Sequence, residues 1–233
     1  MSGTGPDGAR AFTFAGRSLV ALASGALWWP HLRTLLVADL HLGRSERQAR
    51  RGGPLLPPFE TAETLDRLEA ALASTDPARV VSLGDAFDDT AAVGALDARA
   101  LGRIARMAEG RDWRWIAGNH DPLGRAPPSG LPGDWLPEWT LDGLTLRHEA
   151  RPGAGPDISG HYHPKLRLAG RLHPAMLVGR EHLVLPAFGA FTGGLDATRP
   201  PLCDLVGPGI ALVTGAAVLA VPLTGAGGRR LRG

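Results

Sequence analysis

Cysteine and lysine are nearly absent from this 233-residue chain, which contains one of each, Cys203 and Lys165. A single cysteine excludes an internal disulfide and favours a reducing compartment, so we expect a cytoplasmic protein. The other basic residues are all arginines, which codon bias explains unless the guanidinium groups serve to bind phosphate. A strong charge of one sign is also lacking: the net charge of +2 does not indicate a bulk attraction to nucleic acid.

Long uninterrupted hydrophobic runs are missing as well. Segment 205–228 has no charged residue, but Pro208, Pro222 and several glycines make it a poor membrane-spanning helix. We predict two strands there, at 210–213 and 217–221, and no membrane association. The apolar stretch 19–23 is too short for a signal peptide, so we expect no secretory signal.

What the chain does contain is typical of a globular protein, with 44% hydrophobic and 21% charged residues. The length permits one large α/β domain or two small ones, and the sequence shows no repeat and no convincing domain boundary. We therefore expect a single domain over residues 1–233, with mobile ends at 1–10 and 227–233.

Apolar strand-like runs alternate with amphipathic segments in the first half of the chain. Strands are predicted at 12–16, 18–22, 34–38, 79–83 and 113–117, helices at about 57–74 and 89–109, and loops at 43–53 and 122–137, the second containing Trp135. A hairpin at 141–148 and strands at 157–159, 166–168 and 182–185 predict, with the late pair, a second sheet.

Each polar cluster of interest follows one of these strand-like runs. The clusters are Asp39 with His41, then Asp85, then Asn119 with His120 and Asp121, then His148, and finally His161 with His163. Carboxylate, amide and imidazole groups are hard or borderline metal ligands, and open α/β sheets place their sites at strand carboxyl ends. Our central hypothesis is that Asp85 bridges two metal ions. The remaining histidines, His31, His173 and His182, are interpreted as core residues.

This order of residues resembles the calcineurin-like metallophosphoesterase superfamily. The match runs from Asp39 to His163, and its most specific elements are Gly118-Asn119-His120-Asp121 and Gly160-His161-Tyr162-His163. The resemblance implies an α/β fold in which two mixed β-sheets form a four-layer α/β/β/α sandwich.

The resemblance also implies a role for each residue of the clusters. Asp39, His41 and His163 would hold one metal ion, Asn119, His148 and His161 would hold the other, and Asp85 would bridge both. His120 would contact a substrate oxygen or protonate the leaving group, and Asp121 would orient its ring.

Two divalent ions about 3.5–4 Å apart can clamp a phosphoryl group and supply hydroxide near neutral pH. Asp39 and Asp85 provide only two negative charges, so a positive field would remain to attract a phosphodiester. Oxygen and imidazole ligands without thiolate favour Mn²⁺, with Fe or Zn as alternatives.

A closer resemblance, to the bacterial ligase-associated DNA damage response endonucleases of the PdeM group, extends from about Trp29 to Leu195. It rests on residues 29–30, 36–43, 163–164 and 185–194. It implies a Mn²⁺-dependent DNA phosphodiesterase that works in repair beside an ATP-dependent ligase, a helicase and a nuclease. Residues 185–194 are otherwise interpreted as a structural turn.

One position departs from that group, which commonly has a histidine three residues after the bridging aspartate, where this chain has Asp88. A carboxylate cannot be the same proton donor near neutral pH, and beside the substrate phosphate it would repel the anion. Arg44, one of four arginines in segment 43–53, is our candidate for a phosphate contact. That segment is otherwise interpreted as a solvated surface.

The sequence thus predicts a metal-dependent endonuclease that hydrolyses DNA phosphodiester bonds in DNA repair by attack of metal-bound hydroxide. One alternative is a hydrolase of small nucleotides or phosphomonoesters at the same two-metal site. A second alternative is a binding scaffold without catalysis. All the expected metal-ligand residues and His120 are present, which argues against it. Whether the chain forms a homo-oligomer stays open.

Overall fold

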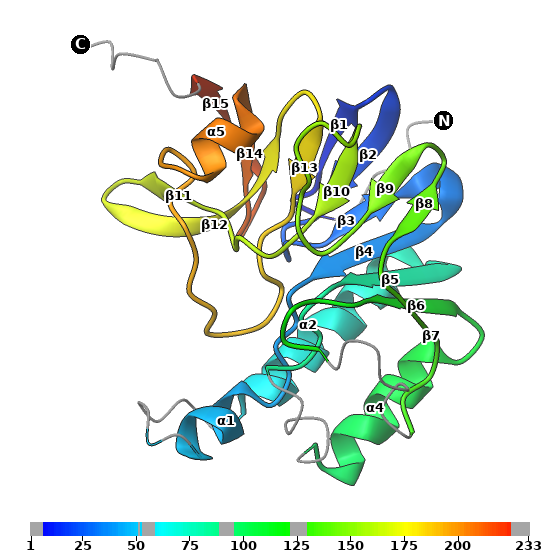
Figure 1. The fold of residues 1–233 in the computed structure, drawn as a ribbon. Coiled ribbons are helices and arrows are strands. Elements are labelled where there is room, and N and C mark those ends of the chain that lie inside the picture. Colours follow the sequence, from blue (N-terminus) through cyan, green and yellow to red (C-terminus); the bar gives the residue numbers. More distant parts are fainter. Residues whose placement is uncertain (1–6, 51, 53–58, 89–95, 122–129, 225–233) are drawn as a thin grey trace.

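The computed structural model describes residues 7–50, 52, 59–88, 96–121 and 130–224. Two β-sheets pack face to face in it (Figure 1). Helices α1, α2 and α4 lie on the outer side of the first sheet, and the short helix α5 lies beside the second. The predicted fold class, an α/β protein built on two mixed sheets, is confirmed.

The first sheet has the strand order β1-β2-β3-β4-β5-β6-β7. Its strands are β1 (Arg10–Phe14), β2 (Arg17–Ala21), β3 (Leu27–Trp29), β4 (Thr34–Ala38), β5 (Arg79–Leu83), β6 (Asp112–Ile116) and β7 (Asp134–Leu136). Strands β1 to β4 pair antiparallel, whereas β4 to β7 pair parallel. The parallel half brings the carboxyl ends of β4, β5 and β6 to one edge of the sheet.

The second sheet has the order β15-β14-β12-β13-β10-β9-β8, and β11 pairs with β12. Its strands are β8 (Trp139–Leu141), β9 (Leu144–Leu146), β10 (Asp157–Ser159), β11 (Lys165–Leu168), β12 (Arg171–Val178), β13 (His182–Val184), β14 (Pro208–Val213) and β15 (Leu219–Thr224). Strands β9, β10 and β13 run parallel to one another, and the other pairs are antiparallel.

The helices are α1 (Arg44–Arg50), α2 (Glu60–Thr75), α4 (Ala98–Ala108) and α5 (Leu202–Val206), with a 3-10 turn at Pro30–Leu32. Helix α4 begins at Ala98 because Asp97 caps it, its side chain accepting the N–H of Ala100 at 2.7 Å. The sequence predicts a helix from about residue 89 to 109, but residues 96–97 are not helical. Residues 89–95 lie outside the described residues, so that part of the prediction is not tested. Segment 43–53 is not simply a loop, since α1 occupies much of it.

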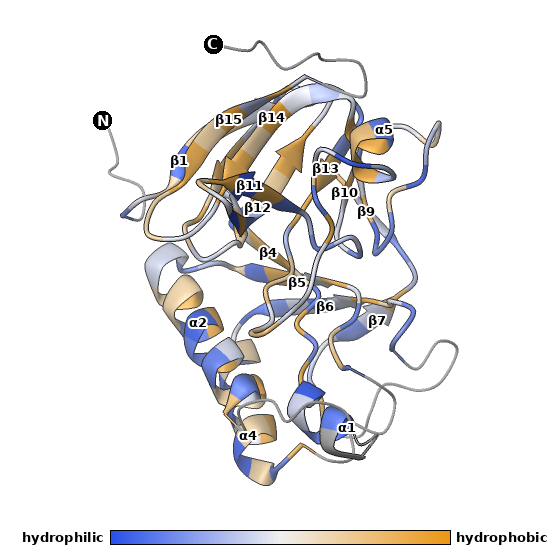
Figure 2. Cartoon of the chain, turned by 90° about the vertical axis from the view of Figure 1, so that its left-hand side faces the viewer, coloured by the Kyte–Doolittle hydropathy of each residue, from blue (hydrophilic) through white to orange (hydrophobic). Residues whose placement is uncertain are grey.

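Three hydrophobic clusters fill the spaces between these layers. One packs helix residues such as Leu65 and Ile104 against the first sheet, one lies between the two sheets and includes Leu36 and Leu146, and one lies on the far side of the second sheet and includes Leu202. Figure 2 shows mixed hydrophilic and hydrophobic residues along α2 and α4, as expected for helices that cover one face of a sheet. The adjacent parallel strands β4 and β5 are mostly apolar and mostly buried.

Several local predictions need correction. Trp135 lies in β7 rather than in a loop, and it stacks on Trp115 with ring centroids 5.5 Å apart. His31 is exposed, so its interpretation as a core residue is wrong. His182 is buried and bonded to Asp157 at 2.9 Å, as expected of a core histidine.

The two chain ends that were expected to be mobile fall mostly outside the described residues. Residues 1–6 and 227–233 belong to that part. Closer to the fold, Gly8 accepts a backbone hydrogen bond from Val218, and β1 already begins at Arg10.

Candidate metal centre

The ligand-bearing turns of both sheets meet at one place. Asp39 directly follows the parallel strand β4, and Asp85 lies two residues after the end of β5. His148 and His161 lie two residues after the ends of β9 and β10 of the second sheet. Asp39, His41, Asp85, His161 and His163 all have positive φ angles, between 43° and 70°. Left-handed backbone at so many non-glycine residues is strained, and such strain gathers at functional sites.

One group of side chains consists of Asp39, His41 and His163, with ligand atoms that all lie within 4.8 Å of one another. The Nε2 atoms of His41 and His163 are 3.1 Å apart, and Nε2 of His163 is 3.7 Å from Oδ1 of Asp39. That Oδ1 atom is buried and has no hydrogen-bond partner. An unpartnered buried carboxylate oxygen facing two imidazole nitrogens is unfavourable alone but fits a divalent cation.

The second group consists of Asp39, Asp85 and His148. The Nε2 atom of His148 lies 2.9 Å from Oδ1 of Asn119, 3.0 Å from Nδ1 of His161 and 3.5 Å from Oδ2 of Asp85. The four residues expected around the second ion are thus together. The carboxylate common to both groups of the structure is that of Asp39, so the bridging role of Asp85 stays a prediction.

Backbone hydrogen bonds fix the two carboxylates. The N–H of His120 donates to Oδ1 of Asp85, and the N–H of His161 donates to Oδ2 of Asp39, both at 2.9 Å. The glycine before each motif makes this approach possible, because a Cβ atom on Gly118 would lie 2.2 Å from Asp85 Oδ1, and one on Gly160 would lie 2.5 Å from Asp39 Oδ2. The glycines of the two motifs are therefore steric requirements of the site.

His120 and Asp121 lie in the turn after β6, as the sequence predicts, but their contacts differ from those expected. Nδ1 of His120 is 2.9 Å from the backbone carbonyl of Asp88. The carboxylate of Asp121 instead accepts the backbone N–H groups of Gly118, Ala86 and Phe87. The expectation that Asp121 orients the His120 ring is therefore wrong: Asp121 holds together the turns after β5 and β6. Burial raises the pKa of Asp121, although these N–H groups oppose the shift.

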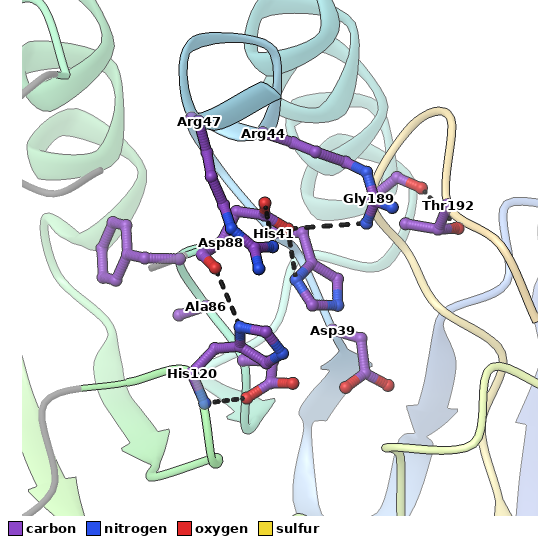
Figure 3. A network of polar contacts seen from close by, with 12 residues as sticks. Asp39, His41, Arg44, Arg47, Ala86, Asp88, His120, Gly189 and Thr192 are labelled. Atoms are coloured by element: carbon purple, nitrogen blue, oxygen red, sulfur yellow. Dashed lines mark hydrogen bonds and ion pairs between the residues drawn. The ribbon is translucent and has the colours of Figure 1, made fainter. Parts of the chain in front are cut away.

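Asp88 is completely buried and does not line the surface at which a phosphate would bind. Its Oδ1 lies 3.1 Å from Nδ1 of His41, and its Oδ2 lies 2.7 Å from Arg47 (Figure 3). Arg44 reaches the same carboxylate at 3.5 Å. Burial alone would raise the pKa of Asp88, but hydrogen bonds from His41 and Arg47 and the nearby charge of Arg44 hold it well below its usual range.

These contacts correct two expectations about the substrate. Asp88 does not lie beside the substrate phosphate, because its carboxylate faces His41 and the two arginines. Arg44, the candidate phosphate contact, takes part in this internal network. Its Nε atom is buried without a hydrogen-bond partner.

The sequence did not predict the residues that contact the candidate ligands His161 and Asp39. Oε1 of Glu149 is 3.8 Å from Nε2 of His161 and accepts a hydrogen bond from the Tyr162 hydroxyl at 3.2 Å. Burial and the nearby Glu149 raise the pKa of Tyr162 to about 12. The N–H of Gly189 donates to the carbonyl of Asp39 at 3.1 Å. The only signal of this last contact was the glycine-rich and aromatic composition of 185–194.

Comparison with known proteins agrees with this fold. Residues 32–170 match the family model for calcineurin-like phosphoesterases. The chain therefore belongs to the calcineurin-like phosphoesterase family, and the resemblance inferred from the motifs is confirmed.

Among solved structures, the chain is similar to the nuclease MPE of Pseudomonas putida. The two are 31% identical, the alignment covers 92% of this chain and 100% of the other, and the TM-score is 0.73. The Escherichia coli phosphoesterase Yfce is 15% identical, with 82% and 98% covered and a TM-score of 0.42. No curated protein matches the chain. None of the described helices is both long and apolar enough to cross a membrane.

Proposed function

We propose that this protein is a metal-dependent phosphodiesterase that cleaves DNA at a centre of two divalent ions. The observation that carries the proposal is the buried, unpartnered Oδ1 of Asp39 between two groups of imidazole and carboxylate donors. Family membership supports phosphoester hydrolysis, and the likeness to a nuclease over 92% of the chain supports a DNA substrate.

The residues present divide naturally between two ions. Asp39, His41 and His163 would hold one ion, Asn119, His148 and His161 the other, and Asp85 would lie between them. When bound, such ions supply Lewis acidity toward a phosphate and lower the pKa of water. The absence of thiolate ligands favours Mn²⁺.

Asp88 fixes the hydrogen positions on two histidines. The Asp88 carboxylate oxygen lies 3.1 Å from Nδ1 of His41 and favours a hydrogen on that nitrogen, which leaves Nε2 free as a metal ligand. The Asp88 carbonyl does the same for His120, because a carbonyl can only accept. The second nitrogen of His120, Nε2, can then carry a proton only in the imidazolium form, and it is the atom that would donate to the leaving oxygen.

The proposal includes a role in DNA repair beside an ATP-dependent ligase, a helicase and a nuclease, in the cytoplasm. Its support is the PdeM-type resemblance over residues 29–195. The chemistry can be tested first, because it does not depend on those partners.

Hydrolysis of bis(p-nitrophenyl) phosphate and nicking of single-stranded DNA should both require Mn²⁺. His120→Ala should lower kcat by about 10²–10⁴-fold with little change in Mn²⁺ affinity, since general acid catalysis contributes that much. His148→Ala should lower the affinity for Mn²⁺ as well. Activity of His148→Ala within a few-fold of the parent would refute the metal centre.

The same assay separates the rival functions. Rapid turnover of nucleotides or phosphomonoesters without any DNA nicking would show that small molecules are the substrates. Mn²⁺ binding below about one ion per chain, with no turnover of any ester, would instead indicate a binding scaffold.

A further inference from the structure

Two exposed phenylalanines that are distant in the sequence lie against each other. Phe59 directly precedes α2, and Phe191 lies in the loop between β13 and α5. Their ring centroids are 6.5 Å apart, and the ring planes meet at 67°. The residues are 56% and 46% exposed, respectively. Large aromatic side chains that remain in water as a pair, instead of entering the core, suggest a surface that meets a ligand.

Backbone contacts hold this pair in place. The N–H of Ala190 donates to Oγ1 of Thr64 at 3.0 Å, which ties the residue before Phe191 to the first turns of the helix that follows Phe59. Phe191 itself has a φ of 55°, in the left-handed region that bulky residues rarely adopt. A strained backbone under an exposed aromatic ring is an arrangement that supports function rather than stability.

The loop that carries Phe191 also runs along the candidate metal centre. At Gly189 the loop is bonded to the Asp39 carbonyl. At Gly194 it passes the His163 backbone so closely that a Cβ there would lie 2.1 Å from the carbonyl oxygen. The loop therefore touches the backbone of two ligand residues of the same ion group.

The start of α1 contacts the residue that follows the other phenylalanine, Phe59. Glu60, the neighbour of Phe59, accepts the backbone N–H of Ser45 at 3.4 Å, which brings the start of α1 and Arg44 to this side of the site. An anionic phosphate at the centre would thus have two aromatic rings on this side of the site. Phosphate next to a flat apolar group is the chemistry of a nucleotide.

We propose that Phe59 and Phe191 form a stacking surface for an unpaired base next to the phosphate at the metal centre. This inference rests on the proposed function and narrows its substrate to nucleic acid whose bases are not held in a duplex. Every base has a stackable face, so the surface gives little sequence preference. In an intact duplex, both faces of an internal base are already covered by its neighbours.

The test measures binding of two fluorescent oligonucleotides in EDTA, where no cleavage occurs. One is a single-stranded thymidine 12-mer, and the other is the same strand with abasic sites, which keeps the phosphates and removes the bases. Phe191→Ala and Phe59→Ala should each bind the 12-mer about 5- to 10-fold more weakly and the abasic strand within twofold of the parent.

Two control variants accompany the test. Phe191→Trp keeps an aromatic face and should retain binding. Leu219→Ala truncates a residue that is 57% exposed on β15 and should leave both affinities unchanged. Equal losses for both strands, or no loss for either, would overturn the stacking surface.

Cleavage by the parent protein in Mn²⁺ then separates the two proposals. Cleavage of DNA with equal binding of both strands would overturn the stacking surface alone. Base-dependent binding without cleavage of any ester would overturn the proposed function alone. Failure of the parent to bind or cleave either strand would overturn both.

Discussion

Replacing Asp88 with alanine removes one carboxylate that holds His41, Arg44 and Arg47 behind the candidate metal centre. Hydrogen bonds to charged groups contribute about 1.5–3 kcal/mol each. The contact with Arg47 is short at 2.7 Å, the contact with His41 measures 3.1 Å, and the contact with Arg44 is long at 3.5 Å. The arginine side chains keep 20–21% of their surface exposed, so water would recover part of the loss. We expect the free energy of unfolding to fall by about 2–4 kcal/mol.

The same substitution should weaken the metal centre. Without Asp88, the hydrogen on His41 is free to move between its two ring nitrogens, and the ring loses its orientation. Loss of such a supporting carboxylate typically lowers metal affinity by about 10- to 100-fold. Asp88→Asn is the matched control, because its amide oxygen can still accept from Nδ1 of His41 while the negative charge is gone. Asp88→Asn should therefore lose less Mn²⁺ affinity than Asp88→Ala does, while its free energy of unfolding should still fall below that of the parent.

Two measurements on purified protein check these values. Urea unfolding in EDTA gives the stability without a contribution from bound metal, and calorimetric titration with Mn²⁺ gives the affinity. A loss of stability below about 0.5 kcal/mol together with Mn²⁺ affinity within twofold of the parent would refute the role given to Asp88.

Three further outcomes follow from the structure. Gly118→Ala places a Cβ against Asp85, and a displacement of that carboxylate should cost about 100-fold in phosphodiesterase activity; near-normal activity would contradict the steric argument. Burial alone would raise the pKa of Asp112, but hydrogen bonds and charge from Arg79 and Arg114 lower it. Because the pKa of Asp112 is depressed in the folded protein, its charge stabilises the fold above about pH 4, and this stabilisation is lost as the pH falls through the folded pKa. Urea unfolding of the parent and of Asp112→Asn should therefore show a stability difference that shrinks in acid; a difference that grows would contradict this argument. Chelation by EDTA should lower Tm, and Mn²⁺ at 100 times its Kd should restore about 2.7 kcal/mol per independent site; a Tm unaffected by either would argue against a metal centre.

The sequence alone predicted the strand ends that carry chemistry. Short apolar runs such as 79–83 are buried strands, and polar residues that follow parallel strands must meet at one sheet edge. This rule placed Asp39, Asp85 and Asn119 correctly without knowledge of the second sheet. It could not show that Asp39 lies in both ligand groups, because that depends on how the second sheet is packed.

The supporting contacts could not be predicted, for a different physical reason. Asp88 and Asp121 are both aspartates near His120, and only the backbone path decides that the carbonyl of Asp88, not the carboxylate of Asp121, meets the ring. Likewise the prolines and glycines around Trp135 predict a loop, but stacking on Trp115 outweighs this local composition.

Each ligand group draws on both halves of the chain. The first sheet and its turns supply Asp39, His41 and Asp85, but His163 and His148 come from the second sheet, whose strands are made later. A nascent chain that ends before β9 therefore lacks an imidazole from each group. Neither ligand group can therefore be complete until the second sheet has been synthesised.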